Sequence, residues 1–377
     1  MHDDAFDISP TLHRMSGWVE RAPSFWRWLG RMETRLLAGR LEDVEVRRPV
    51  WIAGLARAGS TVLLRIFADL DEVATHRYRD FPFLHIPKLW HETVRRQTDG
   101  AAEPNERAHG DRIEVTPDSP EAMEEPLWMD FFEGLHDPES SNVLEADDAD
   151  PDFDAFFRNH IRKLLLARGG SRYVAKANYN VTRLAYLARA FDDARFVVPV
   201  RRPSAHVASS VKQHRLFCEQ LDADDREVEH LERVGHYEFG PPRTPIHTGD
   251  DEAIAAVRRD WREGREVSGW ARYWGAVYRY LAELFDGDPD VRRAVLVVRY
   301  EDLCDRSSSV LRDLLDHAGF EPGASFVDRH AGNLSRPDYY DSDLSREDRE
   351  RIAERTEDVA RRFGYGDEPA DVPLAGS

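Results

Sequence analysis

The stretch Gly54-Leu-Ala-Arg-Ala-Gly-Ser-Thr61 follows a short apolar run, Val50-Trp-Ile-Ala53, and leads into a helical pattern that opens at Thr61. The apolar run predicts a buried strand, and the two glycines allow a sharp turn before the helix. Consecutive backbone N–H groups in such a loop, together with the positive end of the following helix, bind an anion. The stretch therefore predicts a phosphate-binding loop in an α/β protein.

One position separates this loop from the loops of ATP- and GTP-binding proteins. Ser60 stands where a P-loop NTPase has the lysine that reaches the β- and γ-phosphates. The cation lies instead inside the loop, at Arg57, beside the first bound phosphate rather than along a triphosphate. We therefore expect a nucleotide with a single 5′ anhydride-like group.

Composition limits the possible partners of the protein. The chain has 377 residues and a net charge of −19, so a nucleic-acid duplex or an anionic membrane surface should be repelled overall. Cys218 and Cys304 suggest neither a disulfide framework nor a zinc site. The amino terminus lacks the pattern of a secretion signal, and no apolar run approaches bilayer length. We expect a cytoplasmic protein without a membrane span, and the oligomeric state cannot be read.

Further strands and helices alternate along the chain. Strands are predicted at 172–175, 195–200 and 295–298, and helices at 181–191, 203–216, 267–285, 310–318 and 345–363. The unit from 172 to 200 reads as a βαβ crossover, which implies parallel strands. The pattern predicts a three-layer open parallel sheet flanked by helices. Loops are expected at 99–126 and 137–155, and a charged excursion over the site at 219–260.

A second anion-binding stretch is predicted where the strand at 195–200 ends. Arg201-Arg-Pro203 follows the strand, and Ser209 lies eight residues after Arg201 inside the next helix. Ligands of open α/β sheets collect at the carboxyl ends of strands. Since guanidinium offers a planar fork and serine a short donor, Arg201 and Ser209 suit one phosphate.

Together, the two stretches resemble the sulfotransferases that use 3′-phosphoadenosine-5′-phosphosulfate (PAPS). The family's P-[KR]-S-G-[ST]-[ST] loop is similar to Ala56-Arg-Ala-Gly-Ser-Thr61, and its R-x-P-x(5)-S stretch is similar to Arg201 through Ser209. Three shorter segments also resemble the family: Tyr173-Val-Ala-Lys-Ala-Asn178, Tyr300-Glu-Asp-Leu303 and Phe363-Gly-Tyr365. Arg57 in place of lysine resembles bacterial-type members. Ala58 departs from the family's serine, and Ala177-Asn178 departs from its Thr-Pro.

The resemblance implies a P-loop-NTPase-like sulfotransferase fold, PAPS as co-substrate and no metal. It assigns the 5′-phosphosulfate to Arg57, Ala58, Gly59, Ser60 and Thr61. It also implies that Arg201 and Ser209 grip the 3′-phosphate, and we expect Lys176 to assist at the transferred sulfuryl group. Arg57 would stabilise the leaving group.

The acceptor side is less defined. An acceptor hydroxyl needs a general base, and the candidates are Asp80 first, then His76, Glu124 and Glu125; apolar neighbours are expected to raise the pKa of Asp80. His206 is expected on a helix surface. Six aromatic residues are considered for an acceptor wall: Trp90, Trp128, Phe131, Phe132, Trp270 and Trp274.

We thus expect sulfuryl transfer from PAPS to a hydroxyl or amine of a small-molecule, glycan or lipid acceptor. The alternatives are a P-loop kinase or other phosphotransferase, and a catalytically silent protein that binds an adenosine bisphosphate. Residues 1–47 are expected to form a helical lead-in packed on the domain through Trp18, Phe25, Trp26, Trp28 and Leu29. The domain itself should span 48–366, with insertions near 99–155 and 215–265, and 367–377 should be a flexible tail.

Overall fold

A parallel sheet forms the centre of the computed structural model, which describes residues 8–97, 105–106, 114–221, 225–336 and 344–366. Its strands follow the order β2-β5-β1-β6-β7, and every neighbouring pair is parallel. The strands are β1 (Val50–Ala53), β2 (Val73–Ala74), β5 (Arg172–Ala177), β6 (Arg195–Val200) and β7 (Val295–Arg299). The predicted class, an open parallel α/β sheet flanked by helices, is confirmed.

Strand β1 occupies the middle of the sheet. Val50 pairs with Val174 of β5 on one edge and with Arg195 of β6 on the other. The predicted crossover from β5 to β6 is parallel, as expected, but the two strands are separated by β1 rather than adjacent. Since β1 is buried on both faces, its four residues are all apolar.

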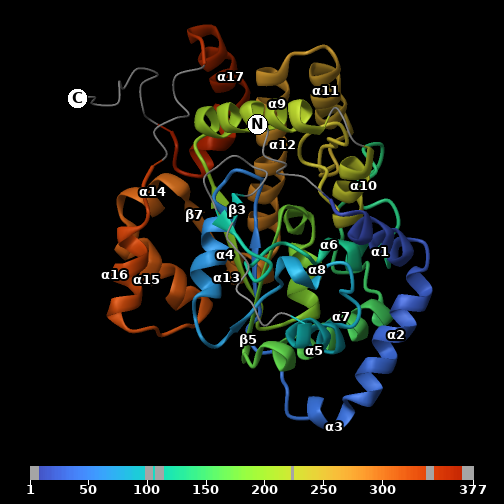
Figure 1. The fold of residues 1–377 in the computed structure, drawn as a ribbon. Helices are drawn as coiled ribbons and strands as arrows, with labels where there is room; N and C mark the ends of the chain where they lie inside the picture. The colour runs from blue at the N-terminus through green and yellow to red at the C-terminus, as the bar shows by residue number, and fades with distance from the viewer. Residues whose placement is uncertain (1–7, 98–104, 107–113, 222–224, 337–343, 367–377) are drawn as a thin grey trace.

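Side chains of the sheet alternate between two helical layers. Trp51 and Phe196 face one hydrophobic cluster, whereas Val50 and Val197 face another. Figure 1 shows the layers on either side of the sheet. The first cluster is covered by α7 (Pro151–Arg168), α8 (Leu184–Ala190), α12 (Glu266–Gly287) and α17 (Arg346–Arg362). The second is covered by α4 (Ser60–Ala68), α15 (Ser307–Ala318) and α16 (Ala324–Gly332).

The remaining elements surround these layers. They are α5 (Pro87–Gln97), α6 (Glu125–Met129), α9 (Pro203–Leu221), α10 (Asp225–Val234), α11 (Asp251–Arg262), α13 (Pro289–Ala294) and α14 (Tyr300–Asp305). Two 3₁₀ turns, η1 (Tyr78–Asp80) and η2 (Asn178–Thr182), and a small antiparallel pair, β3 (Asn105–Glu106) with β4 (Glu114–Val115), complete the description.

Helix α7 was not predicted from the sequence. The sequence contains a recognisable start for this helix. Asp150 caps it by accepting hydrogen bonds from the N–H groups of Asp152 and Phe153, and Pro151 occupies the first helical position. The acidic composition of the segment before Pro151 hid this signal.

The amino-terminal helices are α1 (Pro10–Glu20), α2 (Pro23–Leu36) and α3 (Ala38–Leu41). Helix α2 packs closely on α7, since a Cβ built on Gly30 would lie 2.9 Å from Cε2 of Phe156. Of the aromatic side chains expected to pack on the core, Trp26 is buried. The expectation is wrong for Trp18, Phe25 and Trp28, which are exposed because α1 and α2 apply only one face to the body. The predicted tail, 367–377, lies outside the described residues.

Candidate functional site

The loop after β1 stands at the carboxyl end of the central strand. Gly54 allows close contact with β6, because a Cβ there would lie 2.9 Å from the carbonyl oxygen of Pro199. Gly59 has φ 102° and touches the ring of Tyr300, which a Cβ would approach to 2.6 Å. Arg57 also has a left-handed backbone, with φ 71°, a conformation that is rare for a residue with a long side chain. The chain thus holds Arg57 in a specific position at a steric cost.

The loop and the start of α9 meet in space. Nε of Arg57 donates to Oγ of Ser209 at 3.1 Å, and a guanidinium nitrogen of Arg201 donates to the carbonyl oxygen of Arg57 at 3.3 Å. The guanidinium of Arg201 also lies over the ring of Tyr300, 5.0 Å from its centroid. The two stretches that the sequence singled out therefore form one cationic corner at the ends of β1 and β6.

Strand β5 contributes a third cation to the same region. Nζ of Lys176 donates to Oγ1 of Thr61 at 3.2 Å and to Oε1 of Glu121 at 3.0 Å. Lys176 and Glu121 are both largely buried, so their ion pair holds the ammonium group beside the start of α4. Glu121, which the sequence analysis did not list as a site residue, also accepts a hydrogen bond from the hydroxyl of Tyr78.

These side chains enclose a narrow cavity of about 40 Å³. It is lined by Ala56, Arg57, Ser60, Thr61, Glu121, Lys176, Asn178, Phe217, His236, Glu238 and Phe239. Its lining thus combines two cationic side chains, Arg57 and Lys176, with two carboxylates, Glu121 and Glu238. Ala58 faces away from solvent, and its N–H donates to the carbonyl oxygen of Leu55 within the turn.

The segment between α10 and α11 brings His236 and Glu238 into the cavity. Nδ1 of His236 lies 3.5 Å from Oε2 of Glu238, whose other oxygen accepts a hydrogen bond of 2.6 Å from Asn178. Burial lowers the pKa of His236, but the carboxylate of Glu238 outweighs it, so the pKa is raised. Burial raises the pKa of Glu238, but His236 and the Asn178 bond lower it overall. The carboxylate of Glu238 thus favours the protonated form of His236.

Comparison with known proteins identifies the family of this site. A family model described as the sulfotransferase family matches residues 49–238, which include β1, the loop, Lys176, Arg201, Ser209 and His236. The chain belongs to the sulfotransferase family. No curated protein matches the chain.

Solved sulfotransferases are similar to the chain at low sequence identity. The sulfotransferase STF1 of Mycobacterium tuberculosis H37Rv is 16% identical, with 93% of this chain and 89% of that chain covered and a TM-score of 0.47. STF9 of Mycobacterium avium is 15% identical, with 80% of this chain and 71% of that chain covered and a TM-score of 0.46. A sulfotransferase of Alicyclobacillus acidocaldarius is 15% identical, with 84% of this chain and 94% of that chain covered and a TM-score of 0.40.

Asp80 of the sulfotransferase does not line the cavity. It is buried, accepts a hydrogen bond of 2.5 Å from Arg168 and another from the N–H of Arg77, and lies 3.4 Å from Nδ1 of His76. Burial alone would raise its pKa, but the contacts with His76 and Arg168 lower the pKa well below its usual range. The expected upward shift is wrong, because the neighbours of Asp80 are cationic and not only apolar.

The other candidate bases also belong to buried networks outside the cavity. Nε2 of His76 lies 3.0 Å from Nε2 of His160. Burial raises the pKa of Glu124, which accepts hydrogen bonds from Tyr173 and Trp51. Glu125 pairs with both terminal nitrogens of Arg183. Burial would raise its pKa, but Arg183 and His136 lower it to about 2.

Two further expectations need correction. His206 is buried, not on a helix surface, and burial together with the charges of Arg201 and Arg57 lowers its pKa to about 3. It therefore stays neutral beside the cationic corner. None of the six aromatic residues considered for an acceptor wall lines the cavity, whereas Phe217 and Phe239 do. Trp128 and Trp274 are fully buried in the main core.

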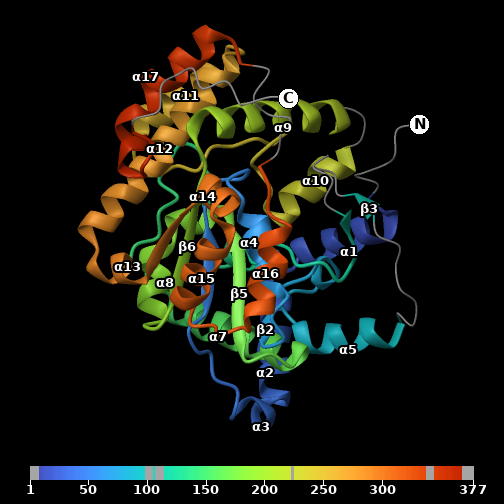
Figure 2. The same cartoon turned by 90° about the vertical axis from the view of Figure 1, so that its left-hand side faces the viewer.

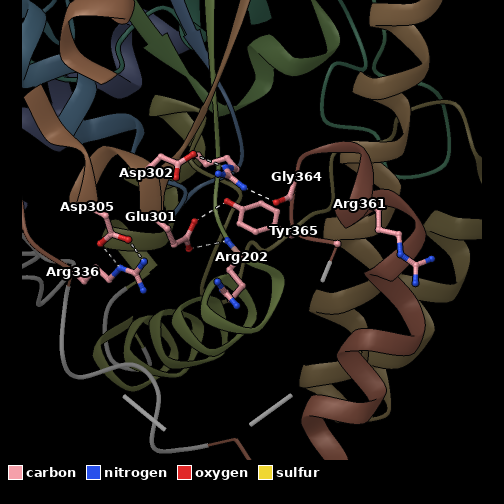
Figure 3. A pocket seen from close by; sticks show the side chains of 10 residues that line it. Arg202, Glu301, Asp302, Asp305, Arg336, Arg361, Gly364 and Tyr365 are labelled. Atoms are coloured by element: carbon pink, nitrogen blue, oxygen red, sulfur yellow. Dashed lines mark hydrogen bonds and ion pairs between the residues drawn. The ribbon is translucent and has the colours of Figure 1, made fainter. Parts of the chain in front are cut away.

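A larger hollow of about 600 Å³ lies beside the cationic corner, at the carboxyl end of β7 (Figure 3). Two ion pairs line it: Arg299 with Asp302, and Arg336 with Asp305. Glu301 accepts hydrogen bonds from the N–H of Arg202 and the hydroxyl of Tyr365. Tyr365 also donates to the carbonyl oxygen of Val200, so this network attaches the Phe363-Gly-Tyr365 segment to the end of β6.

Asp80→Asn should lower the free energy of unfolding at pH 7 by about 3 kcal/mol, because it leaves the buried guanidinium of Arg168 without a charged partner. The pKa of Asp80 is lower in the folded state than in the unfolded state. Its contribution to the free energy of unfolding is therefore complete above about pH 4, the unfolded-state pKa, and is lost as the pH falls toward the folded-state pKa. Urea unfolding from pH 7 to pH 3 should show the difference from wild type narrowing below about pH 4.

Asp118→Asn is the matched control. Asp118 pairs with Arg77 and Arg79 but is half exposed, so its loss should cost about 1 kcal/mol or less. Equal losses in the two variants would contradict the structural role assigned to Asp80.

Proposed function

We propose that this sulfotransferase transfers a sulfuryl group from PAPS to a hydroxyl or amine acceptor. The observation that carries the proposal is the contact of Arg57 with both Ser209 and Arg201, because it joins two anion-binding stretches at neighbouring strand ends. One corner with two anion grips suits a nucleotide that carries charged groups on both its 5′ and 3′ oxygens. The shape of the loop supports this assignment, since the turn at Gly59 has no room for a Cβ.

Positioning and charge account for the chemistry. In sulfuryl transfer the S–O bond to the 5′-phosphate breaks, a bond from the acceptor oxygen to sulfur forms, and the acceptor proton moves to a base. Negative charge grows on the departing phosphate oxygen, so fixed cations at that oxygen lower the barrier. We assign this role to Arg57, with Lys176 near the sulfuryl oxygens and the N–H groups of Gly59, Ser60 and Thr61 around the phosphate.

We propose His236 as the general base in place of Asp80. It lines the same cavity as Arg57 and Lys176, and its ring pairs with Glu238, which would stabilise the imidazolium formed when the acceptor proton arrives. Glu121 then acts as a positioning residue, because its carboxylate is already paired with Lys176. Phe217 and Phe239 provide apolar contacts for the acceptor.

Arg201→Ala combined with Ser209→Ala should weaken the binding of adenosine 3′,5′-bisphosphate by about 100-fold, since charge-assisted hydrogen bonds contribute roughly 1.5–3 kcal/mol each. Adenosine 5′-phosphate, which lacks the 3′-phosphate, should lose much less. Isothermal calorimetry with both ligands measures the difference. Equal losses would refute a 3′-phosphate site, and tighter binding of ATP with magnesium than of the bisphosphate would favour a kinase instead.

Arg57→Ala should lower kcat for sulfuryl transfer by about 100-fold or more, the usual loss when one donor to a developing negative charge is removed. Its thermal unfolding midpoint should stay near that of the wild type. The control is Arg215→Ala, an exposed arginine on α9 away from the cavity lining, which should keep full turnover. Undiminished turnover in Arg57→Ala would remove the assignment.

Glu238→Gln should move the acidic limb of the kcat–pH profile to lower pH. The base must be neutral to accept a proton, and the carboxylate that raises the pKa of His236 would be gone while burial still lowers it. His236→Gln should lower kcat by about 100-fold or more.

Glu232→Gln, an exposed glutamate at the end of α10, serves as the control and should leave the profile unchanged. A loss of activity in Glu238→Gln that is uniform across pH would contradict the role of His236 and would point to Glu238 itself.

A further inference from the structure

The exposed apolar side chains of the sulfotransferase gather on one flank. Among the described residues, the large hydrophobic side chains that are exposed are Trp18, Phe25, Trp28, Leu36 and Leu89. Trp18 lies on α1, the next three lie on α2, and Leu89 of α5 donates its N–H to Glu33 of α2. Scattered exposed apolar residues are normal, whereas a contiguous group marks an interaction surface. We call this group the α1–α2 face.

The face is an ordered feature of a docked helix. The spacing of Phe25, Trp28 and Leu36 places these residues on the side of α2 that is opposite to the buried Trp26, Gly30 and Glu33. The rings form a chain, with centroids 6.1 Å apart for Trp18 and Phe25 and 5.8 Å apart for Phe25 and Trp28. The inner side is anchored by the buried pair of Lys163 with Glu33, 2.9 Å apart. Figure 1 shows α1 and α2 along the outer edge of the molecule.

The net charge of helices α1 to α3 is opposite in sign to that of the whole chain, although Arg31 pairs with Asp152 of α7. Residues 10–41 contain six arginines and no lysine, against two glutamates, in a protein with a net charge of −19. Of the two glutamates, Glu33 is buried with Lys163 and Glu20 pairs with Arg233 of α10. Arg21 and Arg35 are exposed among the aromatic residues. Because salt screens charges beyond roughly 8 Å, this local balance governs contact with a surface.

We propose that the α1–α2 face docks the protein on an anionic lipid surface. Tryptophan and phenylalanine on one side of a helix insert at the headgroup level, and arginines beside them attract anionic lipids. In the described part of the chain, no helix is both long and apolar enough to cross a bilayer, so the contact is peripheral. A second copy fits the face less well, since a two-fold interface would bring its arginines against the arginines of the partner. The inference does not depend on the donor or the acceptor of the proposed reaction.

The test is cosedimentation of the full chain with vesicles of phosphatidylcholine, with and without phosphatidylglycerol. Wild type should bind the anionic vesicles, with an affinity that falls as salt rises, and should not bind pure phosphatidylcholine. Arg21→Glu with Arg35→Glu should weaken binding by about tenfold or more. Trp18→Ser, Phe25→Ser and Trp28→Ser together should abolish it. Because Trp18 and Phe25 also contact the buried Trp26, circular dichroism is used to check that the variant keeps its fold, and Trp28→Ser alone, which should weaken binding, leaves those contacts in place.

Arg292→Glu with Arg293→Glu is the matched control. It changes the net charge by the same amount on exposed positions of α13, which lies away from α1 (Figure 2), and should bind like the wild type. The proposal is overturned if wild type stays in solution with anionic vesicles, or if both charge reversals weaken binding equally. It is also overturned if wild type is a dimer that the aromatic variant turns into a monomer, since the face would then be a self-association surface.

Discussion

The hydrogen bond from Arg57 to Ser209 joins the two halves of the site, and the sheet makes that contact possible. Strand β1 lies between β5 and β6, so the loop after β1 has the end of β6 on one side and the end of β5 on the other. Arg201 and Ser209 contact the loop from the side of β6, and Lys176 contacts Thr61 from the side of β5. A different strand order would place the same residues at separate points of the edge, and no common cationic corner would form.

Close backbone contacts maintain this corner. Gly54 touches Pro199 and Gly59 touches Tyr300, both at distances that exclude a side chain on the glycine. Tyr300 also lies under the guanidinium of Arg201, so one ring contacts both the loop after β1 and the end of β6. The neutral His206 packs behind the two arginines without adding charge. The cations are thus held in place before any ligand arrives, which is the preorganisation that electrostatic catalysis requires.

Buried polar pairs stabilise the parts of the chain that lie outside the sheet. Arg168 with Asp80, Arg183 with Glu125 and Lys163 with Glu33 each join segments far apart in sequence. Such pairs contribute little net stability compared with apolar contacts, but breaking one is costly. They explain why Asp80 and Glu125 are unsuitable as bases, because each is already paired with a cation. The helices α1 and α2 continue this arrangement to the outer surface, and Arg233 links α1 to α10, which leads toward His236.

Local patterns were sufficient for the four longer strands of the parallel sheet and for the turn after β1, whereas the two-residue strand β2 was not predicted. A buried strand needs a run of apolar residues, and a phosphate loop needs glycines at fixed positions. Both features depend on consecutive residues, such as those from Val50 to Thr61, and can therefore be predicted from the sequence. The spacing from Arg201 to Ser209 is likewise local, since Arg201 lies between β6 and α9 and Ser209 lies in the second turn of α9. These patterns also carried the resemblance to the sulfotransferases, which the family match bears out.

The tertiary structure alone decided which residues share the cavity and what their charges are. His236 and Glu238 lie in a charged segment without a recognisable pattern, and only packing brings them into the same cavity as Lys176. Asp80 appeared suitable because apolar residues follow it, yet its pKa is lowered by contacts with His76 and with Arg168, which lies 88 positions further along the chain. The exposure of Trp18 and Trp28 could not be predicted either, because the sequence of a helix does not show whether the side that carries an aromatic residue packs on the core or faces solvent. Sequence reports local geometry, whereas pKa, pairing and exposure depend on neighbours that folding supplies.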